Sequence, residues 1–142
     1  MTKKRVLFVC IHNSARSQMA EAFLNSIGSA RFEAFSAGLE PGRLNPYAVE
    51  AMKEAGIDIS GNKTKAVADL FDSGQRYDFV ITVCDSRSAE TCPVIPGQTV
   101  LHWEFPDPSA LDGSHEERLE ETGRIRDMIR EKVEAWIREK EK

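Results

Sequence analysis

Residues 5–17 read RVLFVCIHNSARS and join an apolar segment to a helical pattern through a short polar segment. The run from Arg5 to Val9 is apolar after its first residue and rich in β-branched and aromatic side chains, which is typical of a strand buried in a parallel sheet. From Ser14 to Ile27 apolar residues recur at helical spacing, and Gly28 marks the end of that pattern. A strand, a short polar loop and a helix in this order predict the opening unit of an α/β domain.

The same alternation continues along the chain. Asn45 before Pro46 is a typical N-cap and first turn, so it predicts a helix that ends at Gly56. Ser114 and Glu117 form a capping box in front of a long amphipathic helix. The remaining expected elements are a helix at 64–71 and strands at 32–36, 77–83 and 99–103.

These elements predict an α/β fold, a single-domain three-layer sandwich spanning residues 1–142. We expect a four-stranded, mostly parallel sheet with helices on both faces. The longest stretch without a helix or strand period runs from Arg87 to Gly97 and holds Cys92. A loop of that length inside a compact domain is often functional.

Bulk properties narrow the classes of partner. The net charge of −4, with no basic stripe beyond residues 3–5, argues against nucleic acid. No apolar run approaches the roughly 20 residues that span a bilayer, and the apolar run from Val6 to Cys10 is too short for a signal peptide. We therefore expect a cytoplasmic protein. Three cysteines, an odd and small number, favour catalysis, redox exchange or metal binding over a disulfide scaffold.

The loop between the first strand and the first helix is predicted to bind an oxyanion. Backbone N–H groups at a helix N-terminus are unpaired and carry partial positive charge, and the same field favours the thiolate of Cys10. Arg16 can offer two parallel donors to an oxyanion, Asn13 tolerates a left-handed backbone, and the hydroxyl of Ser14 or Ser17 can donate to the thiolate. The expected oxyanion-binding residues are Ile11, His12, Asn13, Ser14, Ala15, Arg16 and Ser17.

The alternative is that Cys10 merely ends a buried strand and that Arg16 is an exposed helix residue. The strand–loop–helix context and the serine after Arg16 favour a catalytic nucleophile. Here the segment resembles the signature loop of the low-molecular-weight tyrosine phosphatase superfamily, a Cys followed by five residues, Arg and Ser. The longer string through Glu21 is closer to the arsenate reductase branch of that superfamily, of the thioredoxin-coupled type.

The resemblance covers nearly the whole chain. It continues through the segments Ser36-Ala37-Gly38, Asn45-Pro46, Ala48 to Glu54, Ile57 to Ser60, Val83-Cys84-Asp85, Cys92-Pro93 and His102-Trp103. It implies a phosphatase-like fold and a thiol relay without a cofactor or metal. In that relay Cys10 attacks arsenic, Cys84 attacks Cys10 and releases arsenite, and Cys92 attacks Cys84. Thioredoxin is the implied reductant, arsenate the substrate, and phosphate or sulfate an alternative occupant; we expect a monomer.

The resemblance also implies that Asp107 is a general acid on a proline-bounded loop. Taken from the residues alone, it is an ordinary turn aspartate. Likewise Cys84 can be a small buried residue at a strand end, and Cys92 an inert loop thiol. A zinc site is disfavoured because the seven-residue gap between them exceeds the usual spacing and no fourth ligand is evident. We expect His102 to be structural.

Three functions remain open at this point: arsenate reductase, low-molecular-weight phosphatase, and a thiol redox or metalloid sensor without turnover. Ser109 and Ala110 follow Asp107-Pro108, where phosphatases of this type place aromatic residues, and this favours a small inorganic oxyanion. Some reductases of this type bind potassium through residues matching Asn13, Glu21 and Ser36. Their acidic partner corresponds to Lys65 here, which argues against that ion site.

Overall fold

The structure is a computed structural model that describes residues 3–84 and 99–140. Four strands and four α-helices follow one another among these residues in the order that the sequence predicts. The strands are β1 (Lys4–Cys10), β2 (Phe32–Gly38), β3 (Phe79–Cys84) and β4 (Thr99–Glu104). The helices are α1 (Arg16–Ile27), α2 (Pro46–Glu54), α3 (Val67–Asp72), the short 3-10 helix η1 (Pro108–Ala110) and α4 (His115–Lys140).

The four strands form one sheet in the order β2-β1-β3-β4, and every neighbouring pair is parallel. The expected four-stranded sheet is confirmed, and its described strands are all parallel rather than mostly so. Because the strands are parallel, their carboxyl ends meet at one edge, where ligands bind in folds of this kind. Cys10 ends β1 and Cys84 ends β3, the neighbouring strand, so both cysteines lie at that edge.

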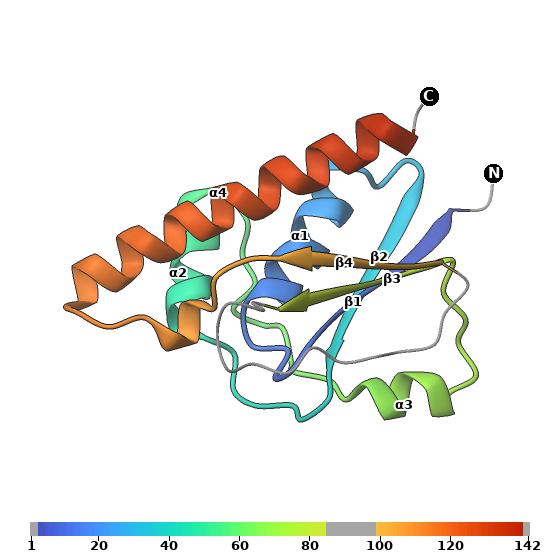
Figure 1. Ribbon diagram of the computed structural model, residues 1–142, viewed down its shortest axis with the longest axis horizontal. Helices are drawn as coiled ribbons and strands as arrows, with labels where there is room; N and C mark the ends of the chain where they lie inside the picture. The colour runs from blue at the N-terminus through green and yellow to red at the C-terminus, as the bar shows by residue number, and fades with distance from the viewer. Residues whose placement is uncertain (1–2, 85–98, 141–142) are drawn as a thin grey trace.

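Helices cover both faces of the sheet and complete the three layers (Figure 1). Helix α1 packs on β1 and β2 and against α4, while α2 packs against α4, and α3 lies on the opposite side of the sheet. The larger apolar core joins β1 to α1 and α4, with Phe8, Phe23 and Ile129 fully or almost fully buried. A smaller core around Leu7, Val80 and Val67 fills the space under α3.

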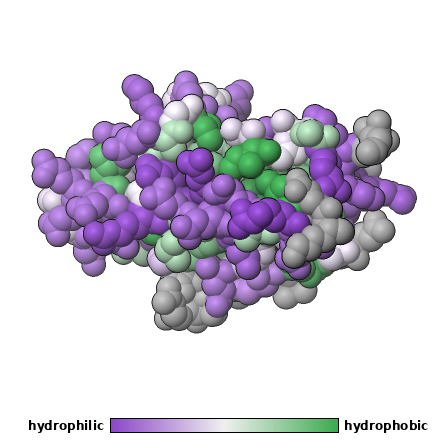
Figure 2. Space-filling view, turned by 90° about the horizontal axis from the view of Figure 1, so that it is seen from above, coloured by the Kyte–Doolittle hydropathy of each residue, from purple (hydrophilic) through white to green (hydrophobic). Residues whose placement is uncertain are grey.

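Helix α4 follows the amphipathic pattern of its sequence. Ile125, Ile129, Val133 and Trp136 are buried, and the face seen from the α4 side is largely hydrophilic (Figure 2). The capping box that the sequence predicts is present, since the Glu117 N–H donates to the Ser114 hydroxyl and the Ser114 N–H donates to the Glu117 carboxylate. Among the described residues, no helix combines the length and the apolar character that crossing a bilayer demands.

Two helices begin later than their periodicity suggests. Helix α1 begins at Arg16 rather than Ser14, because Asn13 takes a left-handed conformation (φ 55°) and the loop turns over the Cys10 sulfur. Helix α3 begins at Val67 rather than Thr64, because the preceding backbone is bound elsewhere: the Lys65 N–H donates to Asn13 Oδ1 and the Thr64 hydroxyl donates to the Gly42 carbonyl. Both differences involve Asn13 in the loop that follows Cys10.

The region expected to be irregular, Arg87 to Gly97, lies outside the described residues, and Cys92 lies there with it.

Candidate active site

The Cys10 thiol sits at the bottom of the loop that joins β1 to α1. It is a free thiol and is only 3% exposed. Its sulfur accepts a hydrogen bond from the Asn13 N–H at 3.0 Å and lies 2.9 Å from the Ser17 hydroxyl oxygen. Because Asn13 Nδ2 donates to that oxygen at 2.9 Å, the hydroxyl proton of Ser17 is directed to the sulfur. Two donors aimed at one sulfur stabilise its thiolate form.

Asn13 holds the loop through its side chain. It is fully buried, and its Oδ1 atom accepts hydrogen bonds from Gln18 Nε2 at 3.0 Å and from the Lys65 N–H at 2.9 Å. Gln18 Nε2 also lies within 3.2 Å of the Asn13 carbonyl and 3.1 Å of the Lys63 carbonyl. These bonds connect the loop, α1 and the segment before α3, so the left-handed residue is held from three directions.

The end of β2 packs directly against the loop. A Cβ atom on Gly38 would lie 2.7 Å from the Ile11 carbonyl oxygen and 2.8 Å from the Asn13 nitrogen, so only glycine fits there. The following residues bind the outer side of the loop: the Glu40 N–H donates to the Ile11 carbonyl, and His12 Nδ1 lies 2.9 Å from the Glu40 carbonyl oxygen. His12 is exposed and contributes to the shape of the loop rather than to a contact with the thiol.

Arg16 is buried at the first turn of α1, with 4% exposed. One guanidinium nitrogen donates to the Phe105 carbonyl at 3.2 Å, and the other lies 3.7 Å from a carboxylate oxygen of Asp107. Arg16 is 89 residues from Phe105 in sequence. The fold therefore brings the predicted anion-binding arginine and the predicted general acid together above the Cys10 loop. The first turn of α1 has no side-chain cap, since its N-cap is Ala15.

The loop that carries Asp107 is anchored by Asn45, whose part in the site the sequence did not indicate. Asn45 Oδ1 caps α2 as expected, accepting from the Tyr47 N–H at 2.8 Å. Its Nδ2 group donates to the Ser109 hydroxyl at 3.0 Å, and its N–H donates to the Ser14 carbonyl at 2.8 Å. Asp107 itself accepts from the Ser109 N–H at 2.9 Å. Asn45 thus connects the oxyanion loop and the acid loop.

Glu21 lies on α1 with most of its carboxyl group buried. Burial raises the pKa of Glu21 above its ordinary value, and the neighbouring Ser36 and Lys65 offset part of that rise. The Lys65 ammonium is 3.9 Å from Glu21 Oε1 and 3.2 Å from the Lys63 carbonyl. The residues therefore do not fit a potassium ion at this position, because a lysine cation already faces the carboxylate. No group of three or more His, Cys, Asp or Glu side chains in residues 3–84 and 99–140 is placed to hold a metal.

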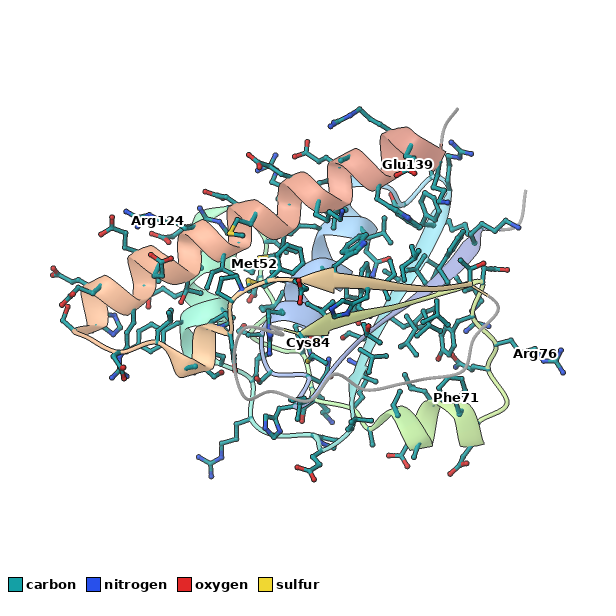
Figure 3. All side chains as sticks on the ribbon, viewed as in Figure 1. Met52, Phe71, Arg76, Cys84, Arg124 and Glu139 are labelled. Atoms are coloured by element: carbon teal, nitrogen blue, oxygen red, sulfur yellow. The ribbon has the colours of Figure 1, made fainter. Side chains whose placement is uncertain are left out.

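Cys84 differs from Cys10 in its chemical state and its neighbours. It is disulfide-bonded and fully buried at the tip of β3 (Figure 3). The imidazole of His102 on β4 lies beside it, with Nε2 at 3.7 Å from the sulfur. The sequence places His102 as a structural residue and does not indicate this contact. Of the predicted relay, Cys10 and Cys84 are described and end adjacent strands, whereas Cys92 lies outside the described residues.

The sequence does not reveal the part that two side chains, Gln18 and Asn45, play in the site, and the reason is the same for both. Gln18 and Asn45 act on residues distant in sequence, so no local spacing reveals them. Only Gln18 has a feature that could have indicated its role: it is a polar residue in the first turn of α1, and the residues beside it in that turn are buried.

Comparisons with known proteins agree with this geometry. The family described as Low molecular weight phosphotyrosine protein phosphatase matches residues 5–142. An arsenate reductase from Shouchella clausii is 41% identical over 138 residues, which are 96% of each chain.

Solved structures extend the likeness to the fold. An arsenate reductase in the phosphate binding state superposes with a TM-score of 0.78 at 33% identity, covering 96% of this chain and 98% of that one. A thioredoxin-dependent arsenate reductase from Corynebacterium glutamicum has a TM-score of 0.59 at 31% identity, over 95% of this chain and 63% of that one.

Proposed function

This chain belongs to the low molecular weight phosphotyrosine protein phosphatase family, and we propose that it is an arsenate reductase that uses a thiol relay re-reduced by thioredoxin. One observation carries the proposal beyond the phosphatase chemistry common to the fold. Cys84 forms a disulfide at the end of the strand next to β1, while Cys10 keeps a free thiol held by two hydrogen-bond donors. Ester hydrolysis has no use for that second redox-active sulfur, and reduction of an oxyanion does.

The first step is covalent capture of arsenate. The Cys10 thiolate attacks arsenic, while Arg16 and the backbone N–H groups of the loop bind the arsenate oxygens. Asp107, 3.7 Å from Arg16, protonates the departing hydroxyl so that it leaves as water. An arsenic–sulfur bond replaces an arsenic–oxygen bond, and arsenic remains As(V).

The second and third steps move electrons. The Cys84 thiolate attacks the Cys10 sulfur, the arsenic–sulfur bond breaks, and its electron pair stays on arsenic, which leaves as arsenite, As(III). Cys92 then attacks Cys84, which frees the Cys10 thiolate and leaves a Cys84–Cys92 disulfide. Thioredoxin reduces that disulfide, in keeping with the thioredoxin dependence named for the Corynebacterium glutamicum relative.

The acid loop supports a small inorganic substrate. Pro108 is buried, and Ser109 and Ala110, which follow it, carry no aromatic ring that could stack on a phenyl group. We propose that arsenate is the substrate, that phosphate binds the same loop, and that hydrolysis of aryl phosphates is a weak side activity. We further propose that the protein acts as a monomer in the cytoplasm, where thiols are kept reduced.

The test is arsenite production in the presence of thioredoxin, its reductase and NADPH. The proposal predicts multiple turnovers, and mass spectrometry after a single turnover without thioredoxin should find a Cys84–Cys92 disulfide. Cys10→Ser should abolish the reaction. A phosphatase would hydrolyse aryl phosphate and form no arsenite. A sensor would lose thiols stoichiometrically with arsenate and show no cycle, so either result contradicts the reductase.

A further inference from the structure

The pairing of β3 with β4 gathers four chemistry-bearing side chains on one face of the sheet. Thr82 pairs with His102 and Cys84 pairs with Glu104, whereas Val83 and Trp103 between them enter the larger core on the other face. His102 also reaches diagonally along the ladder to Cys84. Its two ring nitrogens lie 3.9 and 3.7 Å from the Cys84 sulfur, within hydrogen-bond distance for sulfur.

The neighbours of His102 select which ring nitrogen carries a proton. The Thr82 hydroxyl oxygen lies 3.4 Å from the Leu101 carbonyl, to which it can only donate, and 2.9 Å from His102 Nδ1. With its own proton directed to the carbonyl, that hydroxyl accepts from Nδ1–H. The neutral imidazole then presents the lone pair of Nε2, which is the nitrogen closer to Cys84.

We propose that His102 is a catalytic residue of the relay, acting as the proton acceptor and donor for Cys84; the proposal rests on the function inferred above. In the reduced protein, Nε2 takes the proton of the Cys84 thiol. The resulting thiolate attacks the Cys10 sulfur, a sulfur–sulfur bond forms, and the arsenic–sulfur bond breaks with its electron pair remaining on arsenic. Two sulfurs are oxidised together by two electrons, arsenic is reduced from As(V) to As(III), and the imidazolium releases its proton to solvent.

The same group acts in the return step. When the thioredoxin thiolate attacks the Cys92 sulfur, the Cys84–Cys92 bond breaks and its electron pair goes to Cys84. The imidazolium of His102 protonates this leaving thiolate, and a leaving thiol that is stabilised departs faster. His102 is suited to both directions because its side chain is 39% exposed and can exchange protons with water.

Titratable groups from three elements lie near His102. On its own strand Glu104 Oε1 lies 3.7 Å from Nε2. From α4, Lys132, Glu139 and Lys140 line a cavity of about 300 Å³ that His102 borders, but the Lys132 ammonium lies over the ring of Trp103, whose side chain enters the other face of the sheet. From β3 the only titratable side chain on this face is Cys84 itself among the described residues.

The experiment isolates the Cys84 thiol. In the full chain carrying Cys10→Ser and Cys92→Ser, Cys84 is the only cysteine, and the ultraviolet absorbance of the thiolate follows its ionisation directly. Adding His102→Gln should move the midpoint of thiolate formation upward by about one pH unit, because glutamine keeps a polar group but loses the ionisable partner. Thr82→Val, which removes the hydroxyl that orients Nδ1, should move it in the same direction by less.

His115→Gln is the matched control. His115 is an exposed histidine on α4 that faces Glu50, so its replacement should leave the midpoint unchanged. In the three-cysteine protein, His102→Gln should lower arsenite production at least tenfold near neutral pH and recover as the pH rises. An unchanged midpoint in both His102→Gln and Thr82→Val overturns the proposal. A shifted midpoint in a chain whose parent forms no arsenite refutes the reductase function while the His102–Cys84 pair stands.

Discussion

The Cys10 loop and the Cys84 site lie at the carboxyl ends of adjacent strands, but they differ in the burial of their neighbouring side chains and in the chemical state of the sulfur. Around Cys10, Asn13, Ser17 and Gln18 are fully buried and joined by hydrogen bonds, and the thiol is free. Around Cys84 the sulfur is disulfide-bonded, and its neighbour His102 lies on β4, an edge strand with mostly exposed side chains. A preorganised site binds and activates an oxyanion, whereas the second thiol needs a partner that exchanges protons. Phosphate ester hydrolysis requires the first region only, and reduction requires both.

Removing the second thiol alone is expected to have the largest effect on arsenite production. Cys84→Ser should abolish steady-state arsenite production, because the arsenic–sulfur adduct at Cys10 then has no resolving thiolate. Aryl phosphate hydrolysis should remain within about twofold, since the nucleophile and Arg16 are untouched. Parallel assays on one preparation measure both. Loss of both activities would show that the two regions do not work separately.

Replacing the buried guanidinium should weaken both reactions. Arg16→Lys loses the pair of donors that reaches the Phe105 carbonyl and Asp107, and lysine cannot offer two parallel hydrogen bonds to an oxyanion. We expect kcat/KM to fall by about 10²–10³-fold for arsenate and for aryl phosphate alike. Arg124→Lys is the control, because Arg124 is exposed on α4 and forms ion pairs with Glu120 and Glu121 (Figure 3). A loss confined to one substrate would contradict a shared binding loop.

Substitutions of two asparagines can separate the effect of the loop's hydrogen bonds on catalysis from their effect on the stability of the fold. Asn13→Ala removes three side-chain hydrogen bonds, to Ser17, Gln18 and the Lys65 N–H, and Asn25→Ala removes two between α1 and the Ala34 backbone. Each should lower the free energy of unfolding by about 1–3 kcal/mol in urea titrations. Only Asn13→Ala should also lower kcat, by about tenfold or more. An equal loss of activity in both would assign the effect to stability.

The buried carboxyl of Glu21 predicts a pH dependence of stability. Its pKa is raised above the ordinary 4.5, chiefly by burial, so the folded protein holds this proton to higher pH than the unfolded chain does. The free energy of unfolding therefore loses this contribution as the pH rises from about 4.5 through the raised value. Glu21→Gln should flatten that slope in urea titrations across the window. A steeper slope in the variant would contradict the assignment.

The smallest effect is expected far from both thiols. Ser114→Ala removes the N-cap of α4 and should lower the unfolding midpoint by about 3 °C with arsenite production unchanged. The pKa of Glu117 is lowered by its hydrogen bonds from Ser114, so the contribution of this carboxylate is present above its ordinary pKa and lost as the pH falls. Calorimetry at acidic and neutral pH measures the difference, which should shrink at the acidic end. A change in arsenite production would contradict the prediction, because it would mean that the start of α4 contributes to catalysis.

Most of the fold follows from local pattern. The strand at Arg5 to Val9, the capping box at Ser114 and the apolar stripe of α4 are read directly from spacing, and all are found. The strand–loop–helix context also indicates Cys10 and Arg16, whereas Asp107 is indicated only by the family resemblance. Helix starts are missed where a distant partner binds the backbone, as Asn13 does for Lys65.

Local sequence pattern is therefore sufficient to predict the strands, the helices, a candidate nucleophile and two further thiols. The groups that face each thiol depend on how the chain folds. Arg16 meets Asp107, Asn45 meets Ser109, and Cys84 meets His102 across separations of 91, 64 and 18 residues. Hydrophobic periodicity reports which side of an element is buried, but hydrogen-bond partners depend on strand order and register, which are set by the packing of the whole chain.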